Sequence, residues 1–426
     1  MNTIQLFTGC GSSLKNKGDH AMLQGIVSFL SEKTDTDKFI LNSLNPPTFE
    51  KNIPYQVVWS PENYFIQKVT PFIDLDHIGR VYAFIIISWI LFNYLLFQAF
   101  SRCLIKNSAI LGYFSRLQNT KAIIITGGGY LNSLWWLDGL YAKACFTIVA
   151  KIAKVPVILT SQGLGPYTHP LDKLAAKILF KAASYIGVRD ANESGSLVNS
   201  LAKKHYYHTG DDALLLTNLS DSKLLKIIHR NKIPENKILV GVNLRDSSEY
   251  SKQHNKPFIK NYVEFLDKLI EEKKFHLVFI PISYNDSDGD HISAKKIHRR
   301  LKNKNAATII SEELKPNEIK SLISIMNYSI GISYHFLLFS ISQGVPSIGL
   351  YQNEYYKKKL TGLFNLYGVN EYCVDINNHD SKDIVNLFNE IIAKRNHINL
   401  MLKKNSDDLV TVSNAAHEKI IKVLAN

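Results

Sequence analysis

The sequence predicts an α/β protein with two Rossmann-like domains facing a cleft, and three observations support this prediction. The 426 residues are 46% apolar and 20% charged, which is the balance of a globular protein with room for two or three domains. Short apolar runs alternate with amphipathic stretches, a pattern typical of βαβ units and parallel sheets. A polar stretch at 219–237 separates two such series and indicates a connection between domains.

The apolar runs have the length and composition of strands buried in a parallel sheet. Eight runs carry this prediction: Ile4–Thr8, Ala122–Thr126, Val155–Thr160, Tyr185–Val188, Ile238–Val242, Phe275–Ile280, Ser329–Ile332 and Val345–Leu350. The stretches between them that predict helices include Leu171–Ala183, Ile259–Glu272 and Asp290–Asn303. We therefore expect an N-terminal Rossmann-like domain at 1–225, a C-terminal one at 226–400 and a C-terminal helical segment at 401–426.

The charge of the chain favours an anionic partner. Fifty Lys and Arg residues against 37 Asp and Glu residues give a formal charge of +13. The basic residues are spread along the chain without a nucleic-acid-binding motif, so we expect no nucleic acid partner. The four cysteines form no C-x-x-C pair, and the first residues lack the features of a signal peptide. These observations predict a cytoplasmic protein with reduced thiols.

The segment Val81–Ser101 departs from the α/β pattern. It has no charged residue over 21 positions, about the length that crosses a bilayer, and Arg80, Arg102 and Lys106 flank it. If the strands predicted at Ile4 and Ala122 belong to one parallel sheet, both ends of the segment lie on the same side of any membrane. A single span is then excluded. Residues 81–101 are then an insertion associated with the cytoplasmic leaflet, its basic flanks against anionic head groups, or a helix of the core or of an oligomer interface.

Six motifs follow predicted strands, where open α/β sheets bind their ligands. They are Gly9–Asp19 (GCGSSLKNKGD), Thr126–Asn132 (TGGGYLN), Ser161–Pro166 (SQGLGP), Val188–Asp190 (VRD), Gly210–Ala213 (GDDA) and the late Ser333–Tyr356 region, which begins SYHFLLFSISQGVP. Glycines allow a backbone to approach a ligand closely and expose N–H groups to anions. Each motif alone is weak evidence, since a Gly-Gly-Gly turn is more often structural, but together they indicate a site.

The order of these motifs resembles that of the polysaccharide pyruvyl transferase family over about residues 9–363. The resemblance implies a GT-B-like fold and transfer of the enolpyruvyl carbons of phosphoenolpyruvate to two hydroxyls of a sugar, as a ketal. Many members carry Arg two residues before the late His, where this chain has Ser333-Tyr334-His335. S-Y-H resembles a subset of the family in which paired Tyr and Lys residues follow, here Tyr355, Tyr356 and Lys359.

Phosphoenolpyruvate carries a phosphate and a carboxylate, so its pocket needs cations and oriented donors. Arg189, Arg245 and Lys359 are the candidate cations, and the V-R-D motif favours Arg189 for the donor. The structural alternative for Arg189 is a salt bridge with Asp190 or Glu193, and Arg245 could equally be structural. The remaining candidate substrate-binding residues are Gly127, Gly128, Gly129, Gln162, Gly163, Ser333, Tyr334 and Tyr356.

Ketal formation needs an acid for the methylene carbon of the donor and a base for the attacking hydroxyl. His335 is our candidate acid because it follows an apolar strand at a predicted helix start and titrates near neutral pH. The alternative is a core histidine bonded to the backbone. Asp19 and Asp211 are candidates for the base or for ligands of the acceptor hydroxyls, as is Asp212. Each could instead be a helix N-cap, which is the favoured interpretation for Asp19.

We expect no metal and no cofactor other than the donor substrate. Asp286, Asp288 and Asp290 have the spacing of a calcium loop, but the Gly and Glu that would complete an EF-hand are missing, which favours a solvated strand-to-helix turn with Asp290 near the helix start. The expected partners are phosphoenolpyruvate, a sugar or lipid-linked oligosaccharide and the membrane surface. The alternatives are a nucleotide-sugar-dependent glycosyltransferase of the same architecture and a non-catalytic, membrane-docked binding protein.

Overall fold

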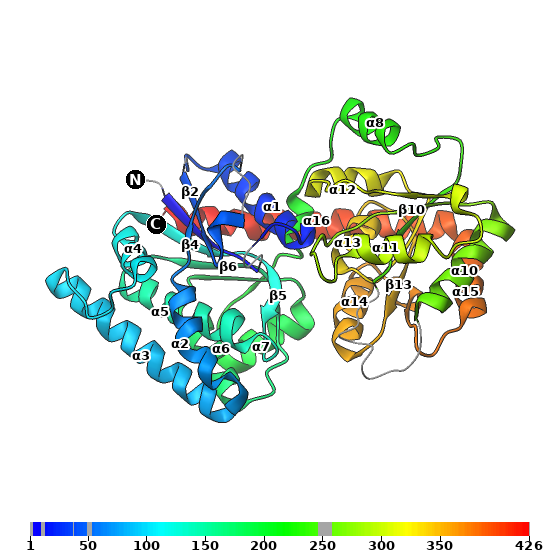
Figure 1. The fold of residues 1–426 in the computed structure, drawn as a ribbon. Coiled ribbons are helices and arrows are strands. Elements are labelled where there is room, and N and C mark those ends of the chain that lie inside the picture. The colour runs from blue at the N-terminus through cyan, green and yellow to red at the C-terminus, as the bar shows by residue number, and fades with distance from the viewer. Residues whose placement is uncertain (1–2, 10–12, 37, 49–52, 246–257, 426) are drawn as a thin grey trace. The chain divides into compact units, whose positions relative to one another are not determined.

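The computed structural model describes residues 3–9, 13–36, 38–48, 53–245 and 258–425, and the chain divides into two compact units (Figure 1). Unit 1 comprises Met1–Leu14, Met22–Leu215 and Thr411–Asn426, and unit 2 comprises Lys15–Ala21 and Leu216–Val410. The sequence placed one boundary at 225/226 and set 401–426 apart. The structure makes its main division after Leu215 and shares the last helix between the units.

Unit 1 is built on a parallel sheet with the strand order β3-β2-β1-β4-β6-β7-β8, in which β5 also pairs with β6. The strands are β1 (Thr3–Phe7), β2 (Lys38–Ser43), β3 (Gln56–Trp59), β4 (Thr120–Ile125), β5 (Gly128–Leu131), β6 (Val157–Leu164), β7 (Tyr185–Val188) and β8 (Tyr207–His208). The four strands predicted in this part of the chain correspond to β1, β4, β6 and β7.

Unit 2 contains a second parallel sheet with the order β11-β10-β9-β12-β13-β14. Its strands are β9 (Leu239–Asn243), β10 (His276–Phe279), β11 (Ala307–Ile309), β12 (Tyr328–Gly331), β13 (Ser347–Tyr351) and β14 (Cys373–Asp375). The prediction of two parallel-sheet α/β domains is therefore confirmed.

Each sheet has a point at which the strand order reverses. In unit 1 this point lies between β1 and β4, and in unit 2 it lies between β9 and β12. The connections after two such strands leave toward opposite faces of the sheet, so a crevice opens at their carboxyl ends. The motifs beginning at Gly9 and Thr126 follow β1 and β4, and Arg245 and Ser333 follow β9 and β12. Three of the six motifs, together with Arg245, therefore follow the strands at the two switch points.

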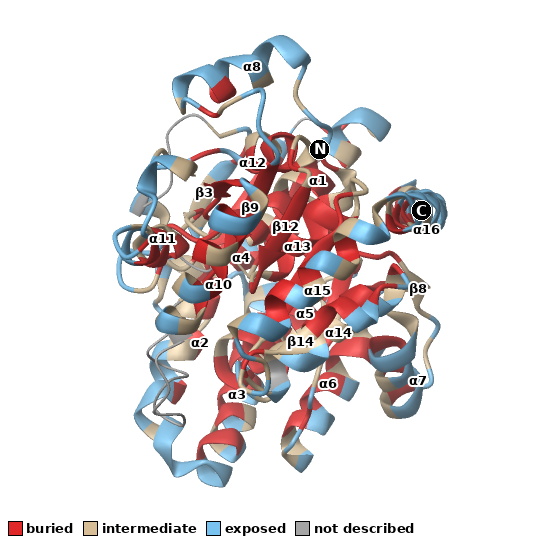
Figure 2. Cartoon of the chain, turned by 90° about the vertical axis from the view of Figure 1, so that its right-hand side faces the viewer, coloured by how far each residue is buried: buried red, intermediate tan, exposed pale blue. Residues whose placement is uncertain are grey.

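Helices cover the sheets. Those of unit 1 are α2 (Glu62–Val69), α3 (His77–Phe100), α4 (Ser108–Leu117), α5 (Ala142–Ile152), α6 (Pro170–Ala182) and α7 (Ser196–Ala202), with the short turns η1 (Pro46–Thr48), η2 (Thr70–Leu75), η3 (Trp136–Tyr141), η4 (Ala191–Gly195) and η5 (Asp212–Leu215). Those of unit 2 are α8 (Asp221–Arg230), α10 (Phe258–Lys273), α11 (Asp290–His298), α12 (Pro316–Ser324), α13 (Tyr334–Ile341), α14 (Glu354–Leu366) and α15 (Ser381–Ala393), with η6 (Lys304–Ala306) and η7 (Asn370–Tyr372). The predicted connection at 219–237 contains α8, which is largely exposed in Figure 2.

Two helices contribute to both units. Helix α1 (Lys17–Lys33) begins in unit 2 and continues in unit 1 from Met22, and α16 (Arg395–Ala425) passes from unit 2 to unit 1 at Thr411. Neither division was predicted, because the apolar pattern of a helix shows which side is buried and not which domain buries it.

The two faces of the first sheet contribute to separate apolar cores. Along β4, Ile123 and Ile125 pack with helices α2 to α6, whereas Ala122 and Ile124 pack with residues of α1 and with Ile420 of α16. Side chains alternate between the faces of a strand, so consecutive residues serve different layers. The end of α16 is therefore part of the hydrophobic core of unit 1.

The apolar segment at 81–101 forms most of α3. This helix is the one described helix that is long and apolar enough to cross a membrane, and 33% of its most apolar stretch is buried inside the protein. Figure 2 shows buried and exposed positions along it. Strands β1 and β4, which precede and follow it, are neighbours in one sheet, as expected. The sequence proposed Arg80 as a contact for lipid head groups, and this is wrong, because Arg80 is buried in an ion pair with Asp172.

Candidate functional site

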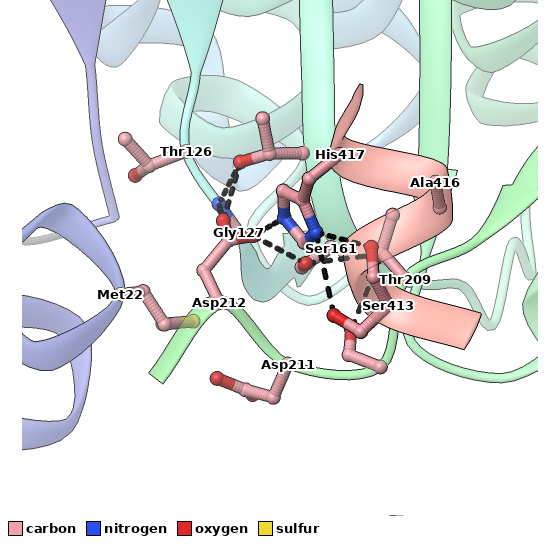
Figure 3. Close-up of polar contacts among 12 residues, drawn as sticks. Met22, Thr126, Gly127, Ser161, Thr209, Asp211, Asp212, Ser413, Ala416 and His417 are labelled. Atoms are coloured by element: carbon pink, nitrogen blue, oxygen red, sulfur yellow. Dashed lines mark hydrogen bonds and ion pairs between the residues drawn. The ribbon is translucent and has the colours of Figure 1, made fainter. Parts of the chain in front are cut away.

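A buried polar cluster lies at the carboxyl edge of the first sheet and is centred on Asp212 (Figure 3). One oxygen of its carboxylate accepts hydrogen bonds from Thr160 Oγ1 at 2.5 Å and from the Gly127 amide at 3.3 Å. The other lies 2.5 Å from Ser161 Oγ and 2.9 Å from His417 Nε2. Strand β6, the loop after β4 and helix α16 thereby meet at a carboxylate of η5.

The backbone of β6 explains how two consecutive hydroxyls reach the same carboxylate. Neighbouring residues of a regular strand point to opposite faces of the sheet. Here the pairing of β6 with β7 is irregular between Leu159 and Gln162, and Ser161 has a φ of 44°, in the left-handed region that few residues other than glycine adopt. The irregularity turns Ser161 to the same side as Thr160. Such strained residues are concentrated at functional sites.

The surroundings of Asp212 keep it ionised. Burial alone would raise the pKa of this carboxyl group, but the hydrogen bonds and charge of His417, with those of Ser161 and Thr160, outweigh burial and hold the pKa below its ordinary value. His417 is itself fully buried, and its Nδ1 lies 2.8 Å from the carbonyl oxygen of Ser413. The pair forms a fixed polar link between helix α16 and the Gly127 loop.

The predicted glycines of the TGGG turn have different roles. A Cβ on Gly127 would lie 3.0 Å from Ser161 and 3.1 Å from Asp212, and one on Gly128 would lie 2.2 Å from the ring of Tyr130. Gly128 is therefore explained by packing alone. The carbonyl of Gly129 accepts a hydrogen bond from Asn132, which gives the turn its shape.

Gln162 and Gly163 lie in β6, beside this turn. The buried amide nitrogen of Gln162 donates to the carbonyls of Ile125, Thr126 and Thr160 at 2.9 to 3.0 Å. It ties β6 to the end of β4, so its role in the structure is to support the glycine turn. A Cβ on Gly163 would meet its neighbours only at ordinary van der Waals distance, 3.5 Å or more.

Arg189 follows β7 and is buried in an ion pair with Asp211, whose Oδ2 lies 2.9 Å from Nε of the arginine. A second nitrogen of the guanidinium contacts the sulfur of Met22 at 2.8 Å. The sequence offered Asp190 or Glu193 as the structural partner, and this was wrong: Asp190 instead accepts from the amides of Glu193 and Ser194 and begins η4. Figure 3 shows the carboxylate of Asp211 directed away from the His417–Asp212 pair.

A second group of predicted residues lies in unit 2, at the switch point between β9 and β12. Ser333 occupies the N-cap position of α13, and Tyr334 and His335 are its first two residues, both buried. The ring of His335 packs against Gly18 of α1, so closely that a Cβ on Gly18 would lie 2.0 Å from Nδ1. The end of the first motif, Asn16–Asp19, and the S-Y-H motif are more than 300 residues apart in sequence, and they pack against each other through Gly18 and His335.

Asp19 is not the N-cap of α1, contrary to the prediction. Asn16 precedes the helix, and its side-chain oxygen accepts from the amide of Gly18 at 3.1 Å. The nitrogen of the same side chain donates to Asp19 Oδ2 at 2.9 Å. Asp19 thus stands in the first turn, where a carboxylate is favoured by the helix dipole.

Arg245 is partly buried and forms an ion pair with Asp290, the buried first residue of α11. Both Nε and Nη2 of Arg245 lie 2.9 Å from the same oxygen, and the neighbouring carboxylate raises the pKa of the guanidinium. The other oxygen accepts from Asn243 and from the amides of Ile282 and Ser283. The predicted strand-to-helix turn is present, but Asp290 is buried rather than solvated.

Tyr356 and Lys359 belong to α14, which follows β13. The amide of Tyr356 donates to the capping side chain of Asn353, and the ammonium of Lys359 lies 5.2 Å from the centre of the Tyr334 ring. A cation over an aromatic face is attracted by the ring quadrupole. Lys359 is thereby held beside the S-Y-H motif.

The predicted site residues fall into two groups. Unit 1 holds Gly127, Gly128, Gly129, Gln162, Gly163, Arg189 and Asp211, and unit 2 holds Asp19, Arg245, Ser333, Tyr334, His335, Tyr356 and Lys359. Within the described ranges, no group of three His, Cys, Asp or Glu side chains has the arrangement of a metal site.

The sequence did not reveal His417. It lies on the apolar side of α16, four residues after Ser413 and three before the buried Ile420. The apolar pattern around position 417 could have predicted that this histidine is buried. Only the folded structure identifies Asp212 as its partner. Thr160 and Ser161 were also missed as a pair, because a regular strand would have separated them.

Two parallel α/β domains with polar residues at the switch points define the class of GT-B-like proteins. The model of one family, described as Polysaccharide pyruvyl transferase, matches residues 16–354 of the chain. The chain therefore belongs to the polysaccharide pyruvyl transferase family. A comparison with curated proteins gives no significant match.

Solved structures confirm the fold. UDP-GlcNAc 2-epimerase from Neisseria meningitidis, bound to UDP-GlcNAc, is 12% identical with a TM-score of 0.56, over 99% of this chain and 100% of that one. HepE from Anabaena, in complex with UDP-glucose, is 13% identical with a TM-score of 0.56, over 99% of each chain. UGT2 from Phytolacca americana is 10% identical with a TM-score of 0.55, over 100% of each.

Proposed function

We propose that the protein transfers the pyruvyl group of phosphoenolpyruvate to two hydroxyls of a sugar, forming a ketal on a polysaccharide or on its lipid-linked precursor. The observation that carries this proposal is the family match together with the placement of His335 at the switch point of unit 2. A histidine at the start of a helix that follows a switch-point strand is placed where α/β proteins bind their ligands.

The chemistry begins with the donor. The imidazolium of His335 gives its proton to the methylene carbon of phosphoenolpyruvate, which becomes a methyl group while C2 becomes electrophilic. A sugar hydroxyl adds to C2 and gives up its proton to a base. The C2–O bond to phosphate then breaks and phosphate leaves with the bonding electrons. A second sugar hydroxyl forms the other C2–O bond and gives its proton to the departing phosphate, which is released as inorganic phosphate.

The charged residues of unit 2 suit the donor. Arg245 keeps its charge beside Asp290, and Lys359 is a point charge next to Tyr334, so both are candidates for the phosphate or the carboxylate. In unit 1, the ion pair with Asp211 fixes the orientation of Arg189, which is the third candidate for donor binding. Asp19 and Asp211 remain alternatives for the base.

Ligand binding tests the choice of donor. Because a ligand that binds only the native state raises its melting temperature, phosphoenolpyruvate should stabilise the protein at concentrations above its dissociation constant. UDP and GDP should not. Pyruvate and inorganic phosphate, added separately, are the matched controls for a general anion effect. Stabilisation by UDP alone would favour a nucleotide-sugar glycosyltransferase, as the ligands named for the structural neighbours suggest.

Kinetics test the proton transfer. We expect His335→Ala to lower turnover by roughly 10²–10⁴ in a protein that still folds, because the acid contributes to the chemical step. The release of inorganic phosphate from phosphoenolpyruvate in the presence of acceptor measures this rate. Normal turnover in His335→Ala would remove His335 from the mechanism. Binding of phosphoenolpyruvate without any turnover across acceptors would instead favour a non-catalytic binding protein.

A further inference from the structure

Helix α3 has one face packed into unit 1 and another that stays exposed. Six large apolar side chains recur every three or four residues on the exposed face and are between 37% and 58% exposed. We call this set the apolar face of α3: Ile78, Val81, Ile85, Trp89, Phe92 and Leu95. Such a contiguous apolar surface is uncommon on a water-soluble protein and marks an interaction site.

The opposite face anchors the helix to the protein along its length. Ala83, Ile86, Ile87 and Ile90 are buried in the core of unit 1. At the first turn, Arg80 is held by Asp172, whose carboxylate also accepts from Ser133 and Tyr141.

About two turns before the helix ends, the side-chain oxygen of Asn93 accepts from the amides of Leu104 and Ile105 at 2.7 and 3.0 Å. A helix that is fixed at Arg80 and at Asn93, and buried along one side between them, cannot cross a bilayer without unfolding the domain. It can contact one only with its exposed face.

The charges near this face complement an anionic surface. No Asp or Glu occurs between Asp76 and Asp138, a stretch with five basic residues, of which Arg102 and Lys106 are exposed just after the helix. On the packed neighbours α2 and α6, Lys68, Lys173 and Lys177 are exposed, whereas Glu62 is buried with Lys143. The exposed acids nearby are Asp74 and Asp76, and Asp76 is paired with Arg80.

We infer that the apolar face of α3 binds the surface of a membrane that contains anionic lipids, with the helix lying in the plane of the interface. Its aromatic and aliphatic side chains enter the boundary between head groups and acyl chains, and Arg102 and Lys106 contact the lipid phosphates. The tryptophan at position 89 belongs to the residue type that prefers this boundary.

Sedimentation with lipid vesicles tests this inference. Wild-type protein should sediment with vesicles that contain phosphatidylglycerol, and less with phosphatidylcholine alone or at high salt. The variant Ile85→Ser/Phe92→Ser/Leu95→Ser should bind at least about tenfold more weakly, because it loses three apolar contacts. The matched control is Leu225→Ser/Leu400→Ser/Val412→Ser, which changes three exposed apolar residues on other helices and should bind normally.

Further variants separate binding from folding. Ile86→Ser changes a buried residue next to the exposed face, so it should lower the melting temperature, whereas the exposed-face variant should not. Arg102→Gln/Lys106→Gln should reduce the preference for anionic vesicles.

The inference is overturned if the wild-type protein does not sediment with anionic vesicles, or if the exposed-face variant sediments equally well. If the protein instead forms a dimer that Ile85→Ser/Phe92→Ser/Leu95→Ser dissociates, the occupant of the face is a second copy of the chain.

Discussion

Gly18 has no side chain because the imidazole of His335 occupies the space where its Cβ would lie. The sequence suggested that glycines near the N-terminus approach a ligand, and the structure shows this one approaching a candidate catalytic residue instead. Gly128 and the ring of Tyr130 have the same relation. At the scale of single residues, a glycine marks a close approach, but the sequence alone does not reveal which group approaches.

The substitution Gly18→Ala tests this contact. In most helices alanine is more stabilising than glycine by about 0.5–1 kcal/mol. At position 18 the sign should reverse, because the new methyl group must displace His335, and both stability and turnover should fall. Gly362→Ala is the matched control, since Gly362 lies in α14 with no atom within 4 Å of its Cβ position.

The control should gain stability and leave turnover unchanged, as measured by thermal unfolding and phosphate release. An equal gain in Gly18→Ala would show that His335 moves without cost and that its position is not fixed by the helix.

The sequence predicted the position of a site residue better than its contacts. His335 was expected at a helix start after an apolar strand, and the structure places it there. The partner of Arg189 was predicted wrongly because the sequence favours near neighbours, whereas Asp211 is brought close by the pairing of β7 with β8. The assignment of Arg189 to donor binding stays a prediction.

At the scale of elements, helix α16 contacts the buried polar cluster around Asp212. Its residue His417 makes a buried hydrogen bond with Asp212, and the hydroxyl of Tyr185 in β7 donates to the carbonyl of Ala416. The helix therefore holds the ends of several strands through polar contacts as well as through Ile420 and Leu424.

Replacing His417 should lower the free energy of unfolding by more than a typical substitution in a helix does. In His417→Ala the buried carboxylate of Asp212 loses its His417 partner and keeps only the neutral donors Thr160, Ser161 and Gly127, and breaking a buried pair in this way typically costs about 3–5 kcal/mol. The matched control His397→Ala changes an exposed histidine of the same helix and should stay within about 0.5 kcal/mol of wild type. Denaturant unfolding measures both values.

The double variant His417→Ala/Asp212→Asn completes a thermodynamic cycle, and it should be less destabilised than the sum of the two single changes. Strict additivity would contradict a direct pairing of these side chains.

Strands were the elements that the sequence predicted most closely, because a buried parallel strand is a continuous apolar run with few alternatives. Helix α16 was predicted only as a helical segment. Its division between the units depends on contacts with residues hundreds of positions away, which leave no local pattern. The irregularity in β6 was also not predicted, since a continuous apolar run predicts a regular strand.

At the scale of the whole molecule, both units contain a buried carboxylate with a lowered pKa. Burial would raise the pKa of Asp290, but Arg245, Asn243 and two backbone amides outweigh it, as His417 and the hydroxyls do for Asp212. The native state binds these protons less readily than the unfolded chain. The stabilisation is therefore fully present above the unfolded pKa of about 3.9 and is lost as the pH falls through the lower native values.

We expect the melting temperature to fall steeply below about pH 4. In Asp290→Asn the protein should be less stable at pH 7, because Arg245 loses its partner, and its stability should change less between pH 5 and 3. The control Asp408→Asn, an exposed position on α16, should follow the wild-type curve. If the melting temperatures of wild type and Asp290→Asn changed in parallel with pH, the carboxyl group of Asp290 would not contribute to the pH dependence of stability.

The two-domain architecture was predictable because alternating strands and helices permit few arrangements. The exposed side of α3 was not, because residues 81–101 are apolar on all sides and only packing shows which of them the core uses. The position of the division after Leu215 likewise depends on contacts that the polar composition of 219–237 does not encode.

The pairing of Asp212 with His417 also sets the order in which the protein can form during synthesis. The two residues are 205 positions apart, so at about 5–20 residues per second the ribosome needs roughly 10 to 40 s to add the second after the first. During that interval the core that α1 forms on one face of the first sheet lacks Ile420 and Leu424. The nascent domain therefore has an incomplete apolar core, and the carboxylate of Asp212 lacks one of its hydrogen-bond partners, until residues 411–425 are added.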